Sequence, residues 1–259
     1  MTQDKRFGVC ALGQVGYRFQ FGQTVVYVDP YLSDYVEEVE GPELRRMFPA
    51  PVAPEAVRDA DWIVLTHAHI DHCDPLTVGA ISKASPSSHF VGPAPVLEVL
   101  RQQGLDESRM HLAPETDWFA LGEAVSITAV PAAHPQVERD RQGRAQCVGY
   151  VLEYQGRRIY HAGDTSLADE LMQRLKELAP IEIAFLPMNE RNYFRARRGI
   201  IGNMTIREAF GLIDEIGVKV LVPTHWDMFE PNSVPREEIE FLYALLKPAC
   251  ELRVYPTEL

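Results

Sequence analysis

The stretch Thr66–Asp74 has the sequence THAHIDHCD, which places three histidines and an aspartate within six residues. It directly follows Trp62–Leu65, a continuous apolar run that is typical of a buried strand. These four groups cannot be spread along one face of a helix, but a tight loop after a strand can turn them all toward one point. Imidazole and carboxylate groups together suit zinc, iron or manganese. The segment therefore predicts a metal site at the end of a strand.

Three further candidate ligands also follow predicted strands, namely His134, Asp164 and His225. Next to Asp164, Gly163 permits close approach of the backbone. A dinuclear site needs about three protein ligands for each ion, with the two ions about 3.5–4 Å apart. We predict that one ion is held by His67, His69 and His134, that the other is held by Asp71, His72 and His225, and that Asp164 lies between them.

Structural roles are the alternatives to metal binding. The motif could be a surface cluster without a metal, and Asp164 could be the N-cap of the helix that follows it. His161 is expected to orient a ligand or to have a structural role. His89 and His111 have no comparable context, so we predict that both are ordinary structural or surface residues.

Around this motif, strand-rich and helix-rich stretches alternate along the chain. Strands are predicted at residues 7–12, 16–21, 24–29, 62–65, 89–91, 118–121, 125–130, 149–154, 158–160, 181–186 and 219–222. Helices are predicted at residues 75–83, 93–103, 167–178, 205–216 and 236–246, with Thr205 as an N-cap and Gly217 as a stop. Residues 34–60 are expected to form an acidic loop with a short helix, and residues 189–203 a polar loop. This order predicts an α/β fold, a four-layer αββα sandwich, rather than a doubly wound sheet.

Composition and charge narrow the class of protein. Of 259 residues, 46% are hydrophobic and 24% are charged, which excludes a disordered or collagen-like chain. The 25 Lys+Arg against 37 Asp+Glu give a net charge of −12, which makes a nucleic-acid partner unlikely. The four scattered cysteines indicate reduced thiols rather than a disulfide framework. No secretory signal pattern or long apolar run is present, so we expect a cytoplasmic protein without a membrane partner.

The pattern H-x-H-x-D-H, followed by a His, an Asp and a His at later strand ends, resembles the metallo-β-lactamase superfamily. The resemblance covers nearly the whole chain. It implies the αββα fold, a single metallo-hydrolase domain over residues 1–259, and a metal-bound hydrolase.

A closer resemblance is to the L-ascorbate-6-phosphate lactonase group. It rests on the segments Val28-Asp29, Tyr160–Asp164, Arg198–Ile200 with Met204-Thr205, and His225-x-Asp227. The chain is shorter than those lactonases, and it has His134 where they have an aspartate. The resemblance implies a small anionic substrate, such as a phosphorylated sugar lactone, and a homo-oligomer.

Two divalent ions, Zn²⁺ or Mn²⁺, would lower the pKa of a shared water to about 7 and so supply a hydroxide at neutral pH. We assign catalytic roles to Asp71, which would manage the proton directly or through a water, and to His225. No G-x-S-x-G segment is present, which argues against a serine nucleophile.

Four arginines, at positions 191, 195, 197 and 198, fall within eight residues of an otherwise acidic chain. Because guanidinium groups bind phosphate and carboxylate well, we predict that Arg198 first, and then Arg195, hold an anionic group beside the metals. Asn189 and Asn203 flank this loop and are candidate polar contacts. The alternatives are a solvated loop and a subunit contact.

The favoured function is a metal-dependent hydrolase of the lactonase type. A phosphodiesterase or nuclease on the same metal scaffold is the main alternative, although the acidic charge weighs against it. A non-enzymatic domain and a true β-lactamase are weaker alternatives. Fold similarity alone cannot separate these functions, because function depends on the site.

Overall fold

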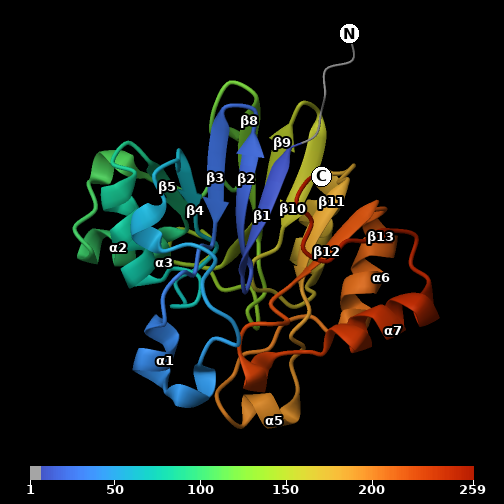
Figure 1. Cartoon of the computed structure of the whole chain (residues 1–259). Coiled ribbons are helices and arrows are strands. Elements are labelled where there is room, and N and C mark those ends of the chain that lie inside the picture. Colours follow the sequence, from blue (N-terminus) through green and yellow to red (C-terminus); the bar gives the residue numbers. More distant parts are fainter. Residues whose placement is uncertain (1–6) are drawn as a thin grey trace.

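Two β-sheets lie face to face, and helices cover both outer faces (Figure 1). The computed structural model describes residues 7–259. The strand and helix positions confirm the predicted four-layer αββα sandwich, and the separation of the strands into two sheets excludes one doubly wound sheet.

The first sheet has six strands in sequence order. They are β1 (Gly8–Gly13), β2 (Gly16–Phe21), β3 (Thr24–Val28), β4 (Trp62–Val64), β5 (His89–Gly92) and β6 (Met110–Leu112). The first three strands pair antiparallel, and β3 to β6 pair parallel. A parallel half follows because α2 (Pro75–Ala84) and α3 (Ala94–Gln102) form crossovers between its strands.

The second sheet has seven strands, which also follow one another in sequence order. Its strands, from one edge to the other, are β13 (Glu251–Leu252), β12 (Val220–Thr224), β11 (Ile183–Pro187), β10 (Arg157–His161), β9 (Val148–Tyr154), β8 (Val125–Pro131) and β7 (Phe119–Ala120). The helices of this half are α4 (Asp169–Glu177), α6 (Ile206–Ile216) and α7 (Arg236–Leu246). Two short helices, α1 (Tyr35–Glu40) and α5 (Tyr193–Ala196), lie together at one end of the molecule (Figure 1).

Buried aromatic side chains join the two sheets. Phe19 of β2 and Phe185 of β11 meet edge to face with ring centroids 5.3 Å apart, and Tyr17 contacts the same Phe185 ring at 4.7 Å. Separate apolar clusters lie between each sheet and its outer helices. In one of them, Val78 and Ile81 of α2 pack against the first sheet. Each sheet is therefore buried on both faces, which explains the continuous apolar runs of its parallel strands.

Most predicted elements are present, and the ends of α6 follow the sequence signals closely. Thr205 caps the helix in a capping box with Glu208, and Gly217 ends it in the left-handed conformation. The prediction missed β6 and β13, which are only three and two residues long. It also missed α5, a four-residue helix that Asn192 caps inside the loop 189–203.

Candidate metal centre

The predicted ligands come together at one edge of the sandwich. β4 leads into His67, β8 into His134, β10 into Asp164 and β12 into His225. β10, β11 and β12 are parallel. β9 is antiparallel to both β10 and β8, so β8 runs in the same direction as β10. The carboxyl ends of these strands therefore meet at the end of the molecule where α1 and α5 lie (Figure 1).

Seven side chains converge there in three overlapping groups. Within each group, the donor atoms lie within 4.8 Å of one another. The groups are His67, His69 and His134; His67, His72 and Asp164; and Asp71, His72 and His225. The first and third groups are the two ligand sets that the sequence predicts.

Asp164 lies between these two sets, as predicted. Its Oδ2 is 3.6 Å from His134 Nε2 and 3.2 Å from His225 Nε2. Its Oδ1 is 3.4 Å from His72 Nε2. One carboxylate thus faces imidazoles from both sets, which is the position a bridging ligand requires.

Asp29 orients the buried histidine of the motif. This carboxylate follows β3 and accepts hydrogen bonds from the backbone N–H and the hydroxyl of Thr66, at 2.8 and 2.6 Å. Its Oδ2 also lies 2.8 Å from Nδ1 of His72, which leaves Nε2 of that ring directed at Asp71 and Asp164. Such outer carboxylates fix the ring and tautomer of a metal-binding histidine. The sequence analysis cited Asp29 for the resemblance but did not assign it to the site.

Gln14 is a second residue that the sequence analysis missed. It lies in the turn between β1 and β2 with a positive φ of 58°. Its side-chain Nε2 donates to Asp71 Oδ2 at 2.7 Å and lies 3.2 Å from His225 Nε2. Its backbone carbonyl accepts a hydrogen bond from the backbone N–H of His225. No local pattern marks a glutamine in a turn, so only the tertiary structure reveals this contact.

The segment after β10 fits closely against the motif. Gly163 has a φ of +58°, and a Cβ on it would lie 2.7 Å from the side chain of Thr66. The predicted close approach at this glycine is therefore confirmed. His161 is fully buried, and its Nε2 lies 2.8 Å from the carbonyl of Val15. Its imidazole therefore holds the turn after β1, in agreement with a structural role.

The electrostatics of the cluster favour a bound cation. Burial, with the neighbouring His72, holds the pKa of His67 well below its ordinary value, and burial lowers the pKa of His134 to about 4. Burial alone would raise the pKa of Asp164, but His225 and His72 hold it well below its usual range. His67 and His134 are therefore in the neutral form that metal binding requires. Burial alone would lower the pKa of His72, but Asp164, Asp71 and Asp29 hold it well above its ordinary value, so a metal ion would displace a proton from this ring.

Unpartnered atoms supply an independent test of whether a metal fits. His72 Nε2 and Asp164 Oδ1 are buried and have no hydrogen-bond partner. Buried polar atoms normally have such partners, so these two atoms, 3.4 Å apart, leave a place for a positive charge that either a proton on His72 or a metal ion can supply. Nitrogen donors mixed with carboxylate oxygens match zinc, manganese or iron. The residues present therefore fit a divalent metal centre.

Comparison with known proteins gives the family of the chain. Residues 24–226 match the model of the beta-lactamase superfamily domain. The chain belongs to the metallo-β-lactamase superfamily. A UPF0173 metal-dependent hydrolase of Pyrococcus abyssi is 27% identical over 253 residues, covering 94% of this chain and 97% of that protein.

Solved structures of similar fold agree with the assignment to this superfamily. A novel metallo hydrolase of the archaeon Ignicoccus hospitalis superposes with a TM-score of 0.71 at 20% identity, over 97% of this chain and 96% of the other. An isothiocyanate hydrolase from Delia radicum gut bacteria gives a TM-score of 0.72 at 19% identity, over 98% of both chains. At these identities the likeness establishes the fold alone.

The superfamily motif opens into a pocket with a volume of about 380 Å³. His69, Asp71, His134, Asp164 and His225 form one side of it. The opposite side comes from α1, from the short helix η1 (Pro42–Leu44), and from the chain after α5. A small molecule in this pocket would contact the metal-binding residues directly.

Of the four predicted substrate contacts, only Arg198 lines this pocket. The guanidinium of Arg195 donates to backbone carbonyls, including those of Glu190 at 2.8 Å and Ser233 at 2.6 Å. Asn189 and Asn203 are fully buried, and Asn203 Nδ2 donates to Asn189 Oδ1 at 2.9 Å. None of these three side chains lines the pocket, and they bond to other parts of the loop and its neighbours instead.

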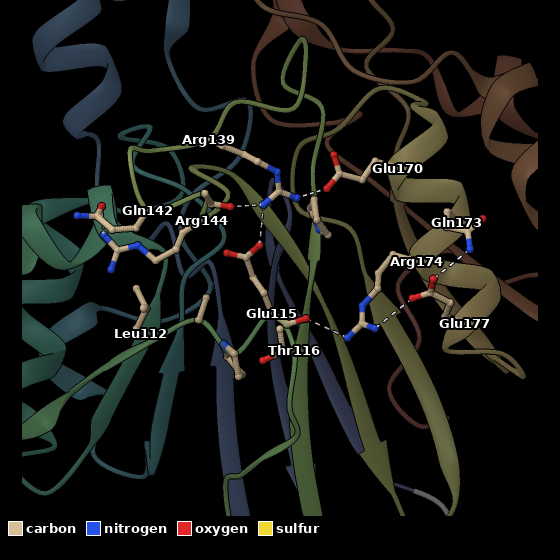
Figure 2. A pocket seen from close by; sticks show the side chains of 14 residues that line it. Leu112, Glu115, Thr116, Arg139, Gln142, Arg144, Glu170, Gln173, Arg174 and Glu177 are labelled. Carbon is tan, nitrogen blue, oxygen red and sulfur yellow. Dashed lines mark hydrogen bonds and ion pairs between the residues drawn. The ribbon is translucent and has the colours of Figure 1, made fainter.

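A larger cavity, with a volume of about 810 Å³, lies beside β8 and α4 (Figure 2). Arginines and glutamates line it, and they are paired with one another. Arg139 contacts both Glu115 and Glu170, and Arg174 contacts Glu177. The metal-binding groups of the superfamily motif do not line this cavity.

Within residues 7–259, no helix combines the length and apolar character needed to cross a membrane.

His89 and His111 form a pair, with Nδ1 of the first 3.0 Å from Nε2 of the second, and both rings lie against Trp62. Neither belongs to a group able to hold a metal among the described residues.

Proposed function

We propose that this protein is a metal-dependent hydrolase that cleaves an ester or lactone bond in a small anionic substrate. The observation that carries the proposal is the convergence of seven His and Asp side chains, including two orphaned buried atoms, at the floor of an open pocket. The superfamily, and relatives named as metal-dependent hydrolases, support the reaction class.

His67, His69 and His134 would hold one divalent ion, and Asp71, His72 and His225 the other, with Asp164 shared. When bound, two such ions lower the pKa of a coordinated water and polarise the bond to be cleaved. Metal identity depends on availability as well as on affinity, and both Zn²⁺ and Mn²⁺ suit these ligands.

Asp71 is placed to handle the proton. Its carboxylate lines the pocket, and Gln14 fixes Oδ2 with a hydrogen bond of 2.7 Å. No hydrogen bond to Oδ1 is present among the described residues, so this oxygen is available to accept a proton from the attacking water. His225 Nε2 lies 3.6 Å from Asp71 Oδ2, so one ion could contact both side chains.

Arg198 would bind the anionic group. It is exposed at the pocket, and within residues 7–259 its guanidinium has no hydrogen bond or ion pair. An unpaired guanidinium can form two parallel hydrogen bonds with one phosphate or carboxylate. Replacing Arg198 with Ala should raise KM for an anionic substrate more than for a neutral one.

The first test is hydrolysis of L-ascorbate 6-phosphate beside bis(p-nitrophenyl) phosphate by metal-analysed protein, with Asp164→Ala as the blank. Lactone turnover that vanishes in the blank would support the lactonase. Turnover of the diester alone would replace it with the phosphodiesterase. If neither compound nor simple carboxylic esters were cleaved by the metal-loaded protein, the proposed ester hydrolase would be refuted.

A further inference from the structure

The pocket above the metal-binding residues has two walls of different chemistry. One carries the imidazole and carboxylate groups described above. The other combines the acidic Glu40 and Glu43 with apolar side chains. The apolar lining residues are Val36, Leu44, Ala68, Ile70, Ile200, Ile201 and Phe229, of which Ala68 and Ile70 come from the motif itself. Val36 and Phe229 are buried in one apolar cluster, against which Leu44 and Ile70 pack. These four residues pack together beside the pocket and form what we call the apolar shelf. Leu44 and Ile70 are its more exposed members, because Val36 and Phe229 are each only 3% exposed.

Hydrogen bonds and ring contacts on both sides keep the shelf in place. Arg46 donates to the carbonyl of Tyr31 at 2.8 Å and lies 4.8 Å from the centre of the Tyr31 ring. The Tyr31 ring lies 5.9 Å from that of Phe229, and the backbone of Met47 donates to the carbonyl of Met228 at 2.9 Å. The shelf is therefore preformed, and a ligand need not order it on binding.

Polar partners for a ligand are few outside the metal-binding cluster. The remaining polar or charged lining residues are Glu40, Glu43, Arg198 and Asn232. Oδ1 of Asn232 already accepts a hydrogen bond from Asn189 at 3.1 Å. Arg198 is the sole cation of this lining. A sugar with several hydroxyl groups would lose hydrogen bonds to water against the shelf and recover few of them.

We propose that the substrate is an amphipathic anion, with an alkyl or aryl group against the apolar shelf and an anionic group at Arg198. Ile200 and Ile201, from the chain after α5, line the same wall as the shelf and would contact the apolar group beside it. This inference rests on the proposed function, since it places the bond to be hydrolysed at the metal-binding wall. It replaces the sugar phosphate with an amphipathic anion as the substrate class.

The test compares two phosphate monoesters of six carbons, hexyl phosphate and sorbitol 6-phosphate, by calorimetric titration of the metal-loaded protein. The compounds share the anionic group and differ in the five hydroxyls. We expect hexyl phosphate to bind at least about tenfold more tightly, and affinity to rise about fourfold per methylene from butyl to hexyl phosphate. Equal binding, or tighter binding of sorbitol 6-phosphate, would overturn the proposal, as would binding of neither compound.

Variants of the apolar wall sharpen the test. Leu44→Asn and Ile200→Asn should each reduce the preference for hexyl phosphate at least about fivefold and leave sorbitol 6-phosphate little changed. Phe241→Asn is the matched control, because Phe241 is 65% exposed on α7 and does not line the pocket. A preference that survives both Leu44→Asn and Ile200→Asn would refute the role of the shelf.

Binding is measured here without turnover, so the two proposals can fail separately. Preferential binding of hexyl phosphate with no cleavage of any ester would keep the amphipathic ligand and refute the ester hydrolase. Ester cleavage with no preference for the apolar ligand would keep the hydrolase and refute the amphipathic substrate. Arg198→Gln should weaken both ligands by the same factor, because they carry the same phosphate.

Discussion

The pocket at the metal-binding residues and the larger cavity beside β8 and α4 are both lined by charged groups, but they differ in how those groups are paired. In the larger cavity, Arg139 contacts Glu115 and Glu170, and Arg174 contacts Glu177 (Figure 2). In the smaller pocket, imidazoles and carboxylates face one another, and buried atoms of His72 and Asp164 lack partners.

The difference shows that neither size nor charge identifies the functional pocket here. The charged cavity has about 810 Å³ against about 380 Å³, yet each of its arginines pairs with a neighbouring carboxylate, although within residues 7–259 the buried Nε of Arg174 lacks a hydrogen-bond partner. A paired arginine has little left to offer a ligand, whereas donor atoms that converge without partners leave a place for an ion. The comparison therefore predicts large functional effects in one pocket and small structural effects in the other.

The largest effect is expected from exchanging a carboxylate for an amide in each pocket. Asp164→Asn should lower turnover more than about 100-fold, since changes to residues outside the ligand set already cost 10–100-fold. Glu170→Gln, the matched change beside Arg139, should leave turnover within about twofold. Steady-state kinetics and metal analysis of both variants check this. Similar losses in the two variants would mean that the comparison between the pockets is wrong.

Metal removal should affect stability through the same pocket. A ligand at 100 times its Kd stabilises the folded protein by about 2.7 kcal/mol, and 1 kcal/mol shifts Tm by about 2–4 °C at this size. The metal-loaded protein should therefore melt about 5–11 °C above the chelated protein in a calorimetric scan. Asp164→Asn should lose most of this difference, and Glu170→Gln should keep it. A chelated protein with an unchanged Tm would contradict a metal bound by the folded state.

A smaller effect is expected from Asp29, which lies behind the ligands. Asp29→Asn removes the charge that orients His72 and should weaken metal affinity about 10–100-fold while sparing the ligand set. Asp59→Asn is the control, because Asp59 pairs with Arg18 on the same sheet, away from the motif. Competition with a chromophoric chelator measures both affinities. An unchanged affinity in Asp29→Asn would show that the ring of His72 is oriented without this carboxylate.

The sequence predicted one pocket well for a physical reason. The motif after β4 concentrates chemistry in six consecutive residues, and the strand that precedes it fixes where those residues lie. His134, Asp164 and His225 follow strands too, so the sheet order brings together what the chain separates. Gln14 could not be predicted in this way, because its role depends on which turn packs beside His225.

The arginine-rich loop shows the opposite case. Four arginines in an acidic chain suggested anion binding, but Arg195 donates to carbonyls and Arg191 pairs with Glu208 at 2.5 Å. Composition gives the charge of a segment but not the direction of each side chain. Only Arg198 reaches the pocket, because the chain turns back after α5, where Arg198 and Ile200 both donate to the carbonyl of Arg195.

The smallest effect is expected in the charged cavity. Arg139→Gln breaks ion pairs with Glu115 and Glu170, and their side chains are between 20% and 46% exposed. Each pair this open to water contributes about 0.2–1 kcal/mol, so the loss of both should lower Tm by at most about 8 °C, and by less in 1 M salt because the charges are screened. Turnover and metal content should not change, because none of the seven metal-binding residues lines the cavity that contains Arg139. A loss of turnover at constant metal content would assign this cavity a part in catalysis and remove the distinction between the two pockets.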